Sequence, residues 1–155
     1  MRLPVERADM MPALVLEPDR VVRATLRDVL NLEGWQVLAA GSGAAGLALA
    51  SKHKPGLALV DVAPSIEAES FCVGIRIRYG PAVPILALSR QWLAPLFRAQ
   101  VAARLGAYDV LRVPFDVDRL LHLLERAQAL HVRNEDLRQR SHEAVVRLRS
   151  LYRVM

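Results

Sequence analysis

Short apolar runs alternate with helix-forming segments five times between residues 13 and 126, and this rhythm constrains the fold more than any other feature of the chain. The runs show little polar alternation, which is typical of strands buried on both faces. Each run is followed by a segment whose apolar residues recur at three- and four-residue spacing, as in an amphipathic helix. Strands alternating with helices require right-handed crossovers, so the sequence predicts one parallel sheet with helices on both faces.

Caps and breakers place the individual elements. Asp19 is a predicted N-cap and Gly34 a helix stop, while Asp116 is expected to cap a helix that opens after Pro114. The expected strands cover residues 13–16, 35–40, 57–60, 83–88 and 108–111, and the expected earlier helices cover 20–33, 42–53, 66–78 and 91–105. Together they predict an α/β, flavodoxin-like, doubly wound five-stranded parallel sheet of strand order 2-1-3-4-5.

Composition limits the class of protein. The chain has 155 residues, 53% of them apolar and 24% charged, which fits one domain with a full core and an appendage and argues against disorder. No apolar run approaches the roughly 20 residues of a membrane span. Residues 1–12 are expected to form a loose tail without the apolar core of a signal peptide, so a cytoplasmic location is expected. The single cysteine, Cys72, excludes an internal disulfide and offers no metal-site spacing.

The last helix is expected to extend past the domain. Seam positions at alternating three- and four-residue spacing run from Leu120 to Met155, which is typical of a coiled coil. We therefore expect a domain at 13–126 and a helical extension at 127–155 that forms a homodimer, although a heterodimer or a helix folded back on its own domain stays open. The expected interface consists of Leu130, Asn134, Leu137, Ala144, Leu148 and Leu151, with Asn134 as the polar residue that fixes register.

Charge suggests a further alternative for the extension. The net charge is +5, and residues 127–155 contain six arginines against three acids. Direct DNA binding by this helix is therefore an alternative function. The excess is modest and no basic block is interleaved with aromatic residues, so we expect a solvated coiled-coil flank rather than a nucleic-acid partner.

The segment GSGAAG, residues 41–46, matches the G-x-G-x-x-G pattern of dinucleotide-binding sites, and Asp61 follows at a suitable distance. The segment follows the second expected strand, whereas the fingerprint belongs to the first β-α-β unit of its fold, and the chain is too short for the second half of such a domain. We therefore expect no nucleotide cofactor, and we assign the small residues to close packing between a helix and the sheet.

Polar residues gather where the expected strands end. In a doubly wound sheet these ends meet at one crevice, and they carry Glu17-Pro18-Asp19, Asp61, Ser89 and the run Arg112–Phe115. With "LGAYDVL" before the last strand end and "VPFDVDRLL" opening the final helix, residues 13–126 resemble the receiver domain of bacterial two-component response regulators. The resemblance implies a signalling module with a histidine kinase or an output protein as partner, and no enzyme activity beyond self-phosphorylation and dephosphorylation.

The resemblance also assigns roles to residues. It implies that Asp61 accepts a phosphoryl group, that Ser89 assists through its hydroxyl, and that Mg²⁺ is held by Glu17, Asp61 and the backbone carbonyl of Ala63. Carboxylate and carbonyl oxygens are the ligands that Mg²⁺ prefers. In the family, a pair of adjacent acids stands at the end of the first strand, and a lysine follows the fifth strand.

This sequence departs from the family at both of those positions. Pro18 stands where the second acid is expected and Val113 where the lysine is expected, while Glu17 is one methylene longer than the usual aspartate. Charge-assisted contacts contribute about 1.5–3 kcal/mol each, so Mg²⁺ binding is expected to be weak. We therefore expect an atypical receiver that acts independently of phosphorylation, with a working phosphoacceptor at Asp61 as the alternative.

His142 lies in "SHEAVV", which begins like the phosphorylated-histidine box of sensor kinases. The proline-containing remainder of that box is absent from residues 141–155, so we expect a solvated helix residue. The cognate partner, the pathway and whether the chain is part of a longer regulator stay open.

Overall fold

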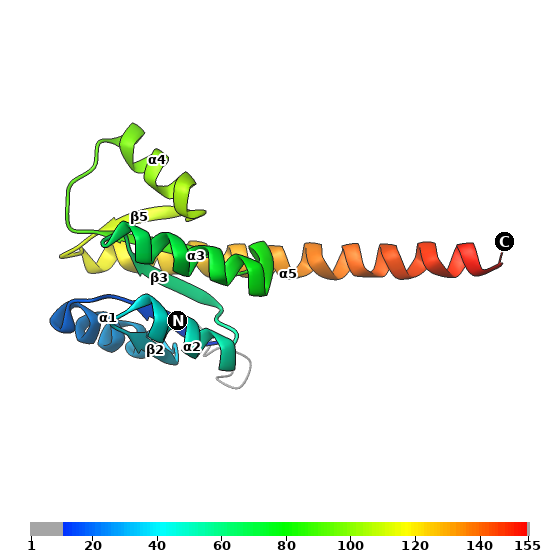
Figure 1. Cartoon of the computed structure of the whole chain (residues 1–155), viewed down its shortest axis with the longest axis horizontal. Coiled ribbons are helices and arrows are strands. Elements are labelled where there is room, and N and C mark those ends of the chain that lie inside the picture. The colour runs from blue at the N-terminus through cyan, green and yellow to red at the C-terminus, as the bar shows by residue number, and fades with distance from the viewer. Residues whose placement is uncertain (1–10, 155) are drawn as a thin grey trace.

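The computed structural model describes residues 11–154, except for the side chains of residues 131, 132, 134, 135 and 154. Five parallel strands form one sheet of order β2-β1-β3-β4-β5, as the sequence predicted. The elements in chain order are β1 Ala13–Leu16, α1 Arg20–Leu32, β2 Val37–Ala40, α2 Gly43–Lys52, β3 Leu57–Asp61, α3 Ser65–Tyr79, η2 Gly80–Ala82, β4 Ile85–Ser89, α4 Pro95–Leu105, β5 Asp109–Arg112 and α5 Val117–Val154. Figure 1 shows the sheet between its helices and α5 extending far beyond it.

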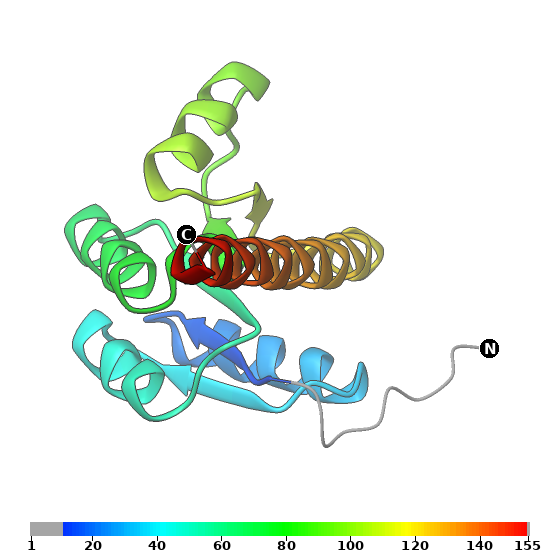
Figure 2. The ribbon, with the colours of Figure 1, turned by 90° about the vertical axis from the view of Figure 1, so that its right-hand side faces the viewer.

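The strand residues alternate between two cores, one on each face of the sheet. One face is covered by α1 and α5, which contribute Leu26 and Leu30, and Leu120 and Leu123 respectively. The other face is covered by α2, α3 and α4, with Phe71 of α3 as its largest fully buried side chain. Figure 2 shows this three-layer arrangement along the axis of α5. Burial on both faces explains why the strands appear in the sequence as continuous apolar runs.

The predicted ends of the first helix are confirmed. Asp19 Oδ1 accepts hydrogen bonds from the backbone amides of Val21 and Val22 at 2.8 and 3.1 Å, which caps α1. At the other end Gly34 has a φ of 92°, a left-handed conformation that favours glycine. These two residues fix the length of the connection between β1 and β2, and they leave Glu17 and Pro18 directly after β1.

Several predicted boundaries are wrong by a few residues. The helix expected from Gln91 begins only at Pro95, because residues 91–94 form an extended loop and proline suits the first turn of a helix. β2 begins at Val37 rather than residue 35, since Trp35 is still bonded to the end of α1 through Leu30. β4 covers 85–89 rather than 83–88, and β5 covers 109–112 rather than 108–111.

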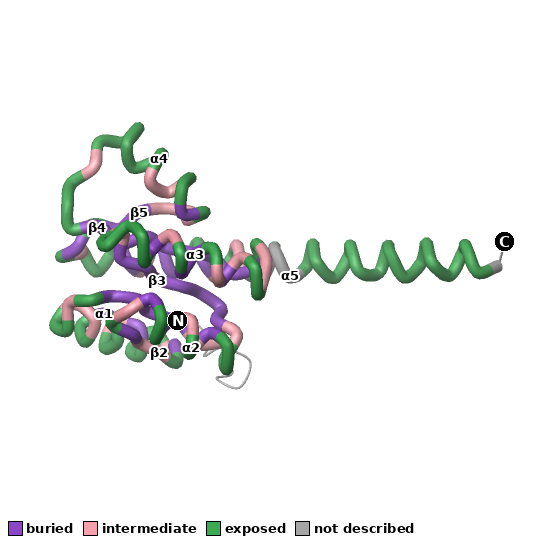
Figure 3. Tube along the Cα trace, viewed as in Figure 1, coloured by how far each residue is buried: buried purple, intermediate pink, exposed green. Residues whose placement is uncertain are grey.

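The long helix α5 changes character along its length. Its first turns are buried against the sheet, where Leu120, Leu123 and Ala127 have no exposed surface. The later turns are exposed throughout residues 136–153, as Figure 3 shows. No helix in the described part of the chain combines the length and apolarity that a bilayer crossing requires.

Candidate functional site

The strand register brings the predicted site residues to one edge of the sheet. Leu16 pairs with Val60 and Asp61 pairs with Leu88, so Glu17, Asp61 and Ser89 end three adjacent strands side by side. All three are buried, with exposed fractions of 0%, 5% and 3%. They are the only buried polar or charged residues in the described part of the chain. Burying charge is costly unless it is paired, so their contacts indicate what this edge of the sheet is built for.

Glu17 has one satisfied and one unsatisfied carboxylate oxygen. Oε1 accepts a hydrogen bond from the backbone amide of Asp19 at 3.0 Å and one from Arg90 Nη2 at 3.2 Å. Oε2 is buried and accepts none. Burial, followed by the adjacent Asp61 carboxylate, raises the pKa of Glu17 to about 7.

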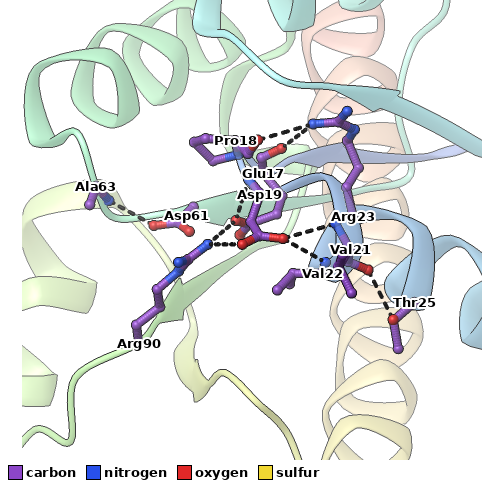
Figure 4. A network of polar contacts seen from close by, with 10 residues as sticks. All are labelled: Glu17, Pro18, Asp19, Val21, Val22, Arg23, Thr25, Asp61, Ala63 and Arg90. Carbon is purple, nitrogen blue, oxygen red and sulfur yellow. Dashed lines mark hydrogen bonds and ion pairs between the residues drawn. The ribbon is translucent and has the colours of Figure 1, made fainter.

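Arg90 is the cation of this site, and the sequence did not predict it. Its Nη2 atom lies 3.2 Å from Glu17 Oε1 and 3.1 Å from Asp19 Oδ2, so one guanidinium bridges both acids of the β1–α1 loop (Figure 4). The two carboxylates raise the pKa of Arg90 still further above its usual range. Its position directly after Ser89, at the end of β4, was the signal that could have revealed it.

A second arginine organises the backbone of the same loop. Arg23 Nη1 of α1 donates to the carbonyl oxygen of Glu17 at 2.8 Å and to that of Pro18 at 3.3 Å. The loop between β1 and α1 is therefore held by an arginine on each side, one bonded to carboxylates and the other to carbonyls. This contact too was absent from the sequence-based prediction.

Asp61 and Ser89 are engaged in local hydrogen bonds. Asp61 Oδ1 accepts the backbone amide of Ala63 at 2.8 Å. Ser89 Oγ donates to the carbonyl oxygen of Gln91 at 3.0 Å and accepts from the amide of Gln91 at 3.2 Å. The Ser89 hydroxyl thus forms a turn at the start of the β4–α4 loop.

The position expected for a lysine is apolar in structure as well as in sequence. Val113 is 4% exposed and belongs to the core shared by α1, α5 and the sheet. The preceding Arg112 ends β5 and is exposed, and its side chain has no hydrogen bond or ion pair with the described residues. Neither residue supplies a charge to Asp61.

The arrangement does not fit a bound Mg²⁺ ion. In the described part of the chain, no three His, Cys, Asp or Glu side chains are grouped so that they could hold a metal. Of the residues that the resemblance implies, Glu17 has one oxygen occupied by Arg90, Asp61 has one oxygen occupied by an amide, and Pro18 provides no side-chain ligand. The chain's own guanidinium supplies the positive charge instead.

The residues predicted for the dimer interface lie on α5. Leu130 is half-buried, and Leu137, Ala144, Leu148 and Leu151 are exposed. The side chain of Asn134 lies outside the described residues, and so does Met155 at the end of the seam. His142 is exposed on the same helix. Elsewhere, Cys72 is a free, buried thiol whose pKa burial raises to about 11.

Comparison with known proteins agrees with this geometry. The response regulator receiver domain family matches residues 13–125. The response regulator protein FleR of Pseudomonas aeruginosa is 34% identical over 114 residues, which are 73% of this chain and 24% of FleR. The transcriptional regulatory protein PdtaR of Mycobacterium tuberculosis strain H37Rv is 33% identical over 119 residues, which are 74% of this chain and 55% of PdtaR.

The solved structures support the same assignment. The chemotaxis protein CheY4 of Vibrio cholerae superposes with a TM-score of 0.68 at 27% identity, over 76% of this chain and 98% of CheY4. NtrX of Brucella abortus, solved with ADP, superposes with a TM-score of 0.72 at 25% identity, over 86% of this chain and 30% of NtrX. The chain thus spans between about a quarter and about half of the two curated relatives. It belongs to the family of response regulator receiver domains.

Proposed function

We propose that this chain is an atypical receiver that acts as a signalling and interaction module independently of phosphorylation. The observation that carries the proposal is the set of charges around Asp61. A phosphoryl group on Asp61 would need positive charge close to its oxygens. The position expected for a lysine is instead the buried Val113, and the guanidinium of Arg90 is bonded to Glu17 and Asp19.

The free energy lost through these replacements favours an Asp61 that does not become phosphorylated. Losing a metal ligand and the lysine removes two charge-assisted contacts of about 1.5–3 kcal/mol each. Each 1.4 kcal/mol corresponds to about a factor of ten in rate or equilibrium. A receiver with this site is expected to become phosphorylated about two to four powers of ten less readily than one that has both the metal ligand and the lysine.

A working phosphoacceptor is the second candidate function, and one observation favours it. Asp61 ends the central strand β3 with its carboxylate beside Glu17 and next to the strand that carries Ser89. The arrangement supports this candidate because Asp61 and Ser89 occupy the strand ends where the family carries its phosphoacceptor and its hydroxyl. For a working phosphoacceptor, the expected partner is a histidine kinase. For a receiver that acts independently of phosphorylation, the expected partner is an output protein.

Intact-mass spectrometry separates the two functions. The purified chain is incubated with acetyl phosphate and Mg²⁺ beside an Asp61→Asn variant. The proposal expects no mass gain in either protein. A gain of one phosphate in the wild type that the variant lacks would establish Asp61 as a working acceptor and overturn the proposal.

The second part of the proposal concerns the extension. We propose that α5 forms a parallel homodimer through its exposed seam, since Leu137, Leu148 and Leu151 have exposed fractions of 49%, 55% and 62% and recur at coiled-coil spacing. Apolar side chains in such a row are stabilised by burial against a partner helix. DNA binding by the arginines of the same helix is the alternative, and it predicts an affinity that falls steeply with salt.

A further inference from the structure

The two acids of the β1–α1 loop, the buried Glu17 and the partly exposed Asp19, are already paired with a cation of the protein itself. Arg90 Nη2 lies within 3.2 Å of both Glu17 Oε1 and Asp19 Oδ2. Glu17 is fully buried, whereas the Arg90 side chain is 54% exposed. The guanidinium therefore reaches inward from a loop at the surface to the edge of the sheet, as Figure 4 shows.

We propose that Arg90 is an internal counter-cation that closes this site to divalent metal ions. When Arg90 is docked on Glu17 and Asp19, the acids are neutralised without a metal. When Arg90 is withdrawn or replaced, the same acids become a divalent-cation site formed by Glu17 and Asp61. This inference rests on the proposed function and deepens it, because it gives a physical reason why the site works without Mg²⁺.

The carboxylate oxygens of Glu17 and Asp61 explain why the site would bind a divalent ion once Arg90 is removed. Glu17 Oε2 is buried without a hydrogen-bond partner, and the register that pairs Leu16 with Val60 places Asp61 beside Glu17 at the end of the adjacent strand (Figure 4). A divalent ion between these carboxylates would satisfy the orphaned oxygen and relieve the repulsion between the two acids. The docked guanidinium opposes this, because it holds the other Glu17 oxygen and repels a second cation nearby.

The position of Arg90 in the chain allows it to undock. Residues 90–94 form the loop between β4 and α4 and belong to no helix or strand. The Arg90 side chain is 54% exposed, so water can solvate the guanidinium once it leaves Glu17 and Asp19. By contrast, Arg23 holds the β1–α1 loop through the backbone carbonyl oxygens of Glu17 and Pro18.

The test is Mn²⁺ binding to the whole chain without any phosphodonor, with free Mn²⁺ measured by electron paramagnetic resonance. Wild type is expected to bind weakly, and Arg90→Gln is expected to bind about tenfold more tightly or better, equal to about 1.4 kcal/mol. Adding Asp61→Asn to the Arg90→Gln variant is expected to abolish the gain. Mn²⁺ should also broaden the Ala63 amide resonance of Arg90→Gln, because this amide is bonded to Asp61.

Arg112→Gln is the matched control, because Arg112 also ends a strand and is exposed, yet bonds to neither Glu17 nor Asp19. It removes the same charge and is expected to leave Mn²⁺ affinity unchanged. Equal affinities of wild type and Arg90→Gln overturn the inference, as does an equal gain in Arg112→Gln or tight binding by the wild type. Arg90→Met provides a second replacement if Arg90→Gln does not fold.

Different experiments overturn the role proposed for Arg90 and the proposed function of the chain. Weak Mn²⁺ binding by both wild type and Arg90→Gln removes the role of Arg90 and leaves a phosphorylation-independent receiver. A phosphate on wild-type Asp61 in the acetyl phosphate assay removes the proposed function, whatever the Mn²⁺ affinities of the variants.

Discussion

Glu17 combines complete burial with an incomplete set of contacts, and this makes the stability of the protein depend on pH. The pKa of Glu17 is raised from 4.5 to about 7 in the folded chain, first by burial and then by Asp61. Between these two values the folded state holds a proton that the unfolded state has released. The free energy of unfolding therefore falls as the pH rises through this window and levels off above pH 7.

Replacing Glu17 by glutamine is expected to remove this fall in the free energy of unfolding with rising pH. At pH 8 the Glu17→Gln variant should have a free energy of unfolding about 1–3 kcal/mol above that of wild type, since a raised carboxyl pKa costs about 1.4 kcal/mol per unit. At pH 3.5 the gain should nearly vanish, because wild-type Glu17 is then largely protonated in both states. Urea unfolding in EDTA at the two pH values measures this difference.

Asp28→Asn is the control for that experiment, because Asp28 is an exposed acid whose side chain has no hydrogen bond or ion pair in the described part of the chain. It should leave the pH dependence as in wild type. A Glu17→Gln gain that is equal at both pH values would show that the ionised carboxylate is not the source of the cost.

The sequence predicted the positions of the site residues better than their contacts. Glu17, Asp61 and Ser89 were found because the ends of parallel strands meet at one edge, which is a property of the fold class. The bridge from Arg90 to Glu17 and Asp19 was missed because it depends on the path of residues 90–94. Nothing in the periodicity of the chain fixes the course of such a loop.

At the scale of elements, α2 and α3 approach closely because glycine lines their contact. A Cβ atom added to Gly46 would lie 2.9 Å from Phe71 Cε2, whereas one added to Gly43 would meet nothing nearer than the Glu67 carbonyl oxygen at 3.5 Å. Phe71 is fully buried and cannot move away easily. The tight contact of the GSGAAG segment is thus with α3, whereas the sequence analysis expected its small residues to pack a helix closely on the sheet.

Alanine substitutions at these two glycines should differ in sign. Gly46→Ala is expected to lower the free energy of unfolding by about 1–3 kcal/mol, because overpacking of the Phe71 contact outweighs the gain in helix propensity. Gly43→Ala is expected to be neutral or stabilising by up to about 1 kcal/mol. Denaturant unfolding compares the two variants with wild type. Equal effects at both positions would show that the contact with Phe71 is not tight.

The apolar spacing of the sequence predicts some helix boundaries and misses others. Apolar spacing predicted a helix from Gln91, but the chain forms no helix before Pro95 because Ser89 and Gln91 are bonded in a turn. By contrast, Asp19 and Gly34 fix the two ends of α1 chemically, and both were predicted. A boundary is predictable where a residue has a specific capping role, and it is uncertain where only periodicity marks it.

For the whole molecule, the decisive question is what covers the exposed part of α5. The heptad spacing does not distinguish a seam packed on the chain's own sheet from one packed on a second chain. In the structure Leu120 and Leu123 are buried in the domain, whereas Leu148 and Leu151 are exposed. In the proposed dimer, this row of exposed leucines would be buried against a second helix.

A single carboxylate in the seam should therefore dissociate the molecule into monomers. In a parallel dimer Leu148→Asp places two acids against each other, and burying unpaired charge costs several kcal/mol, so the dissociation constant should rise by about a hundredfold or more. The receiver core is untouched, and its buried residues keep their packing. Val146→Asp is the matched control, because Val146 is 51% exposed but lies off the seam. Sedimentation velocity over a range of concentrations measures both variants; a monomeric wild type, or equal effects of the two substitutions, would leave α5 without a dimer interface along these leucines.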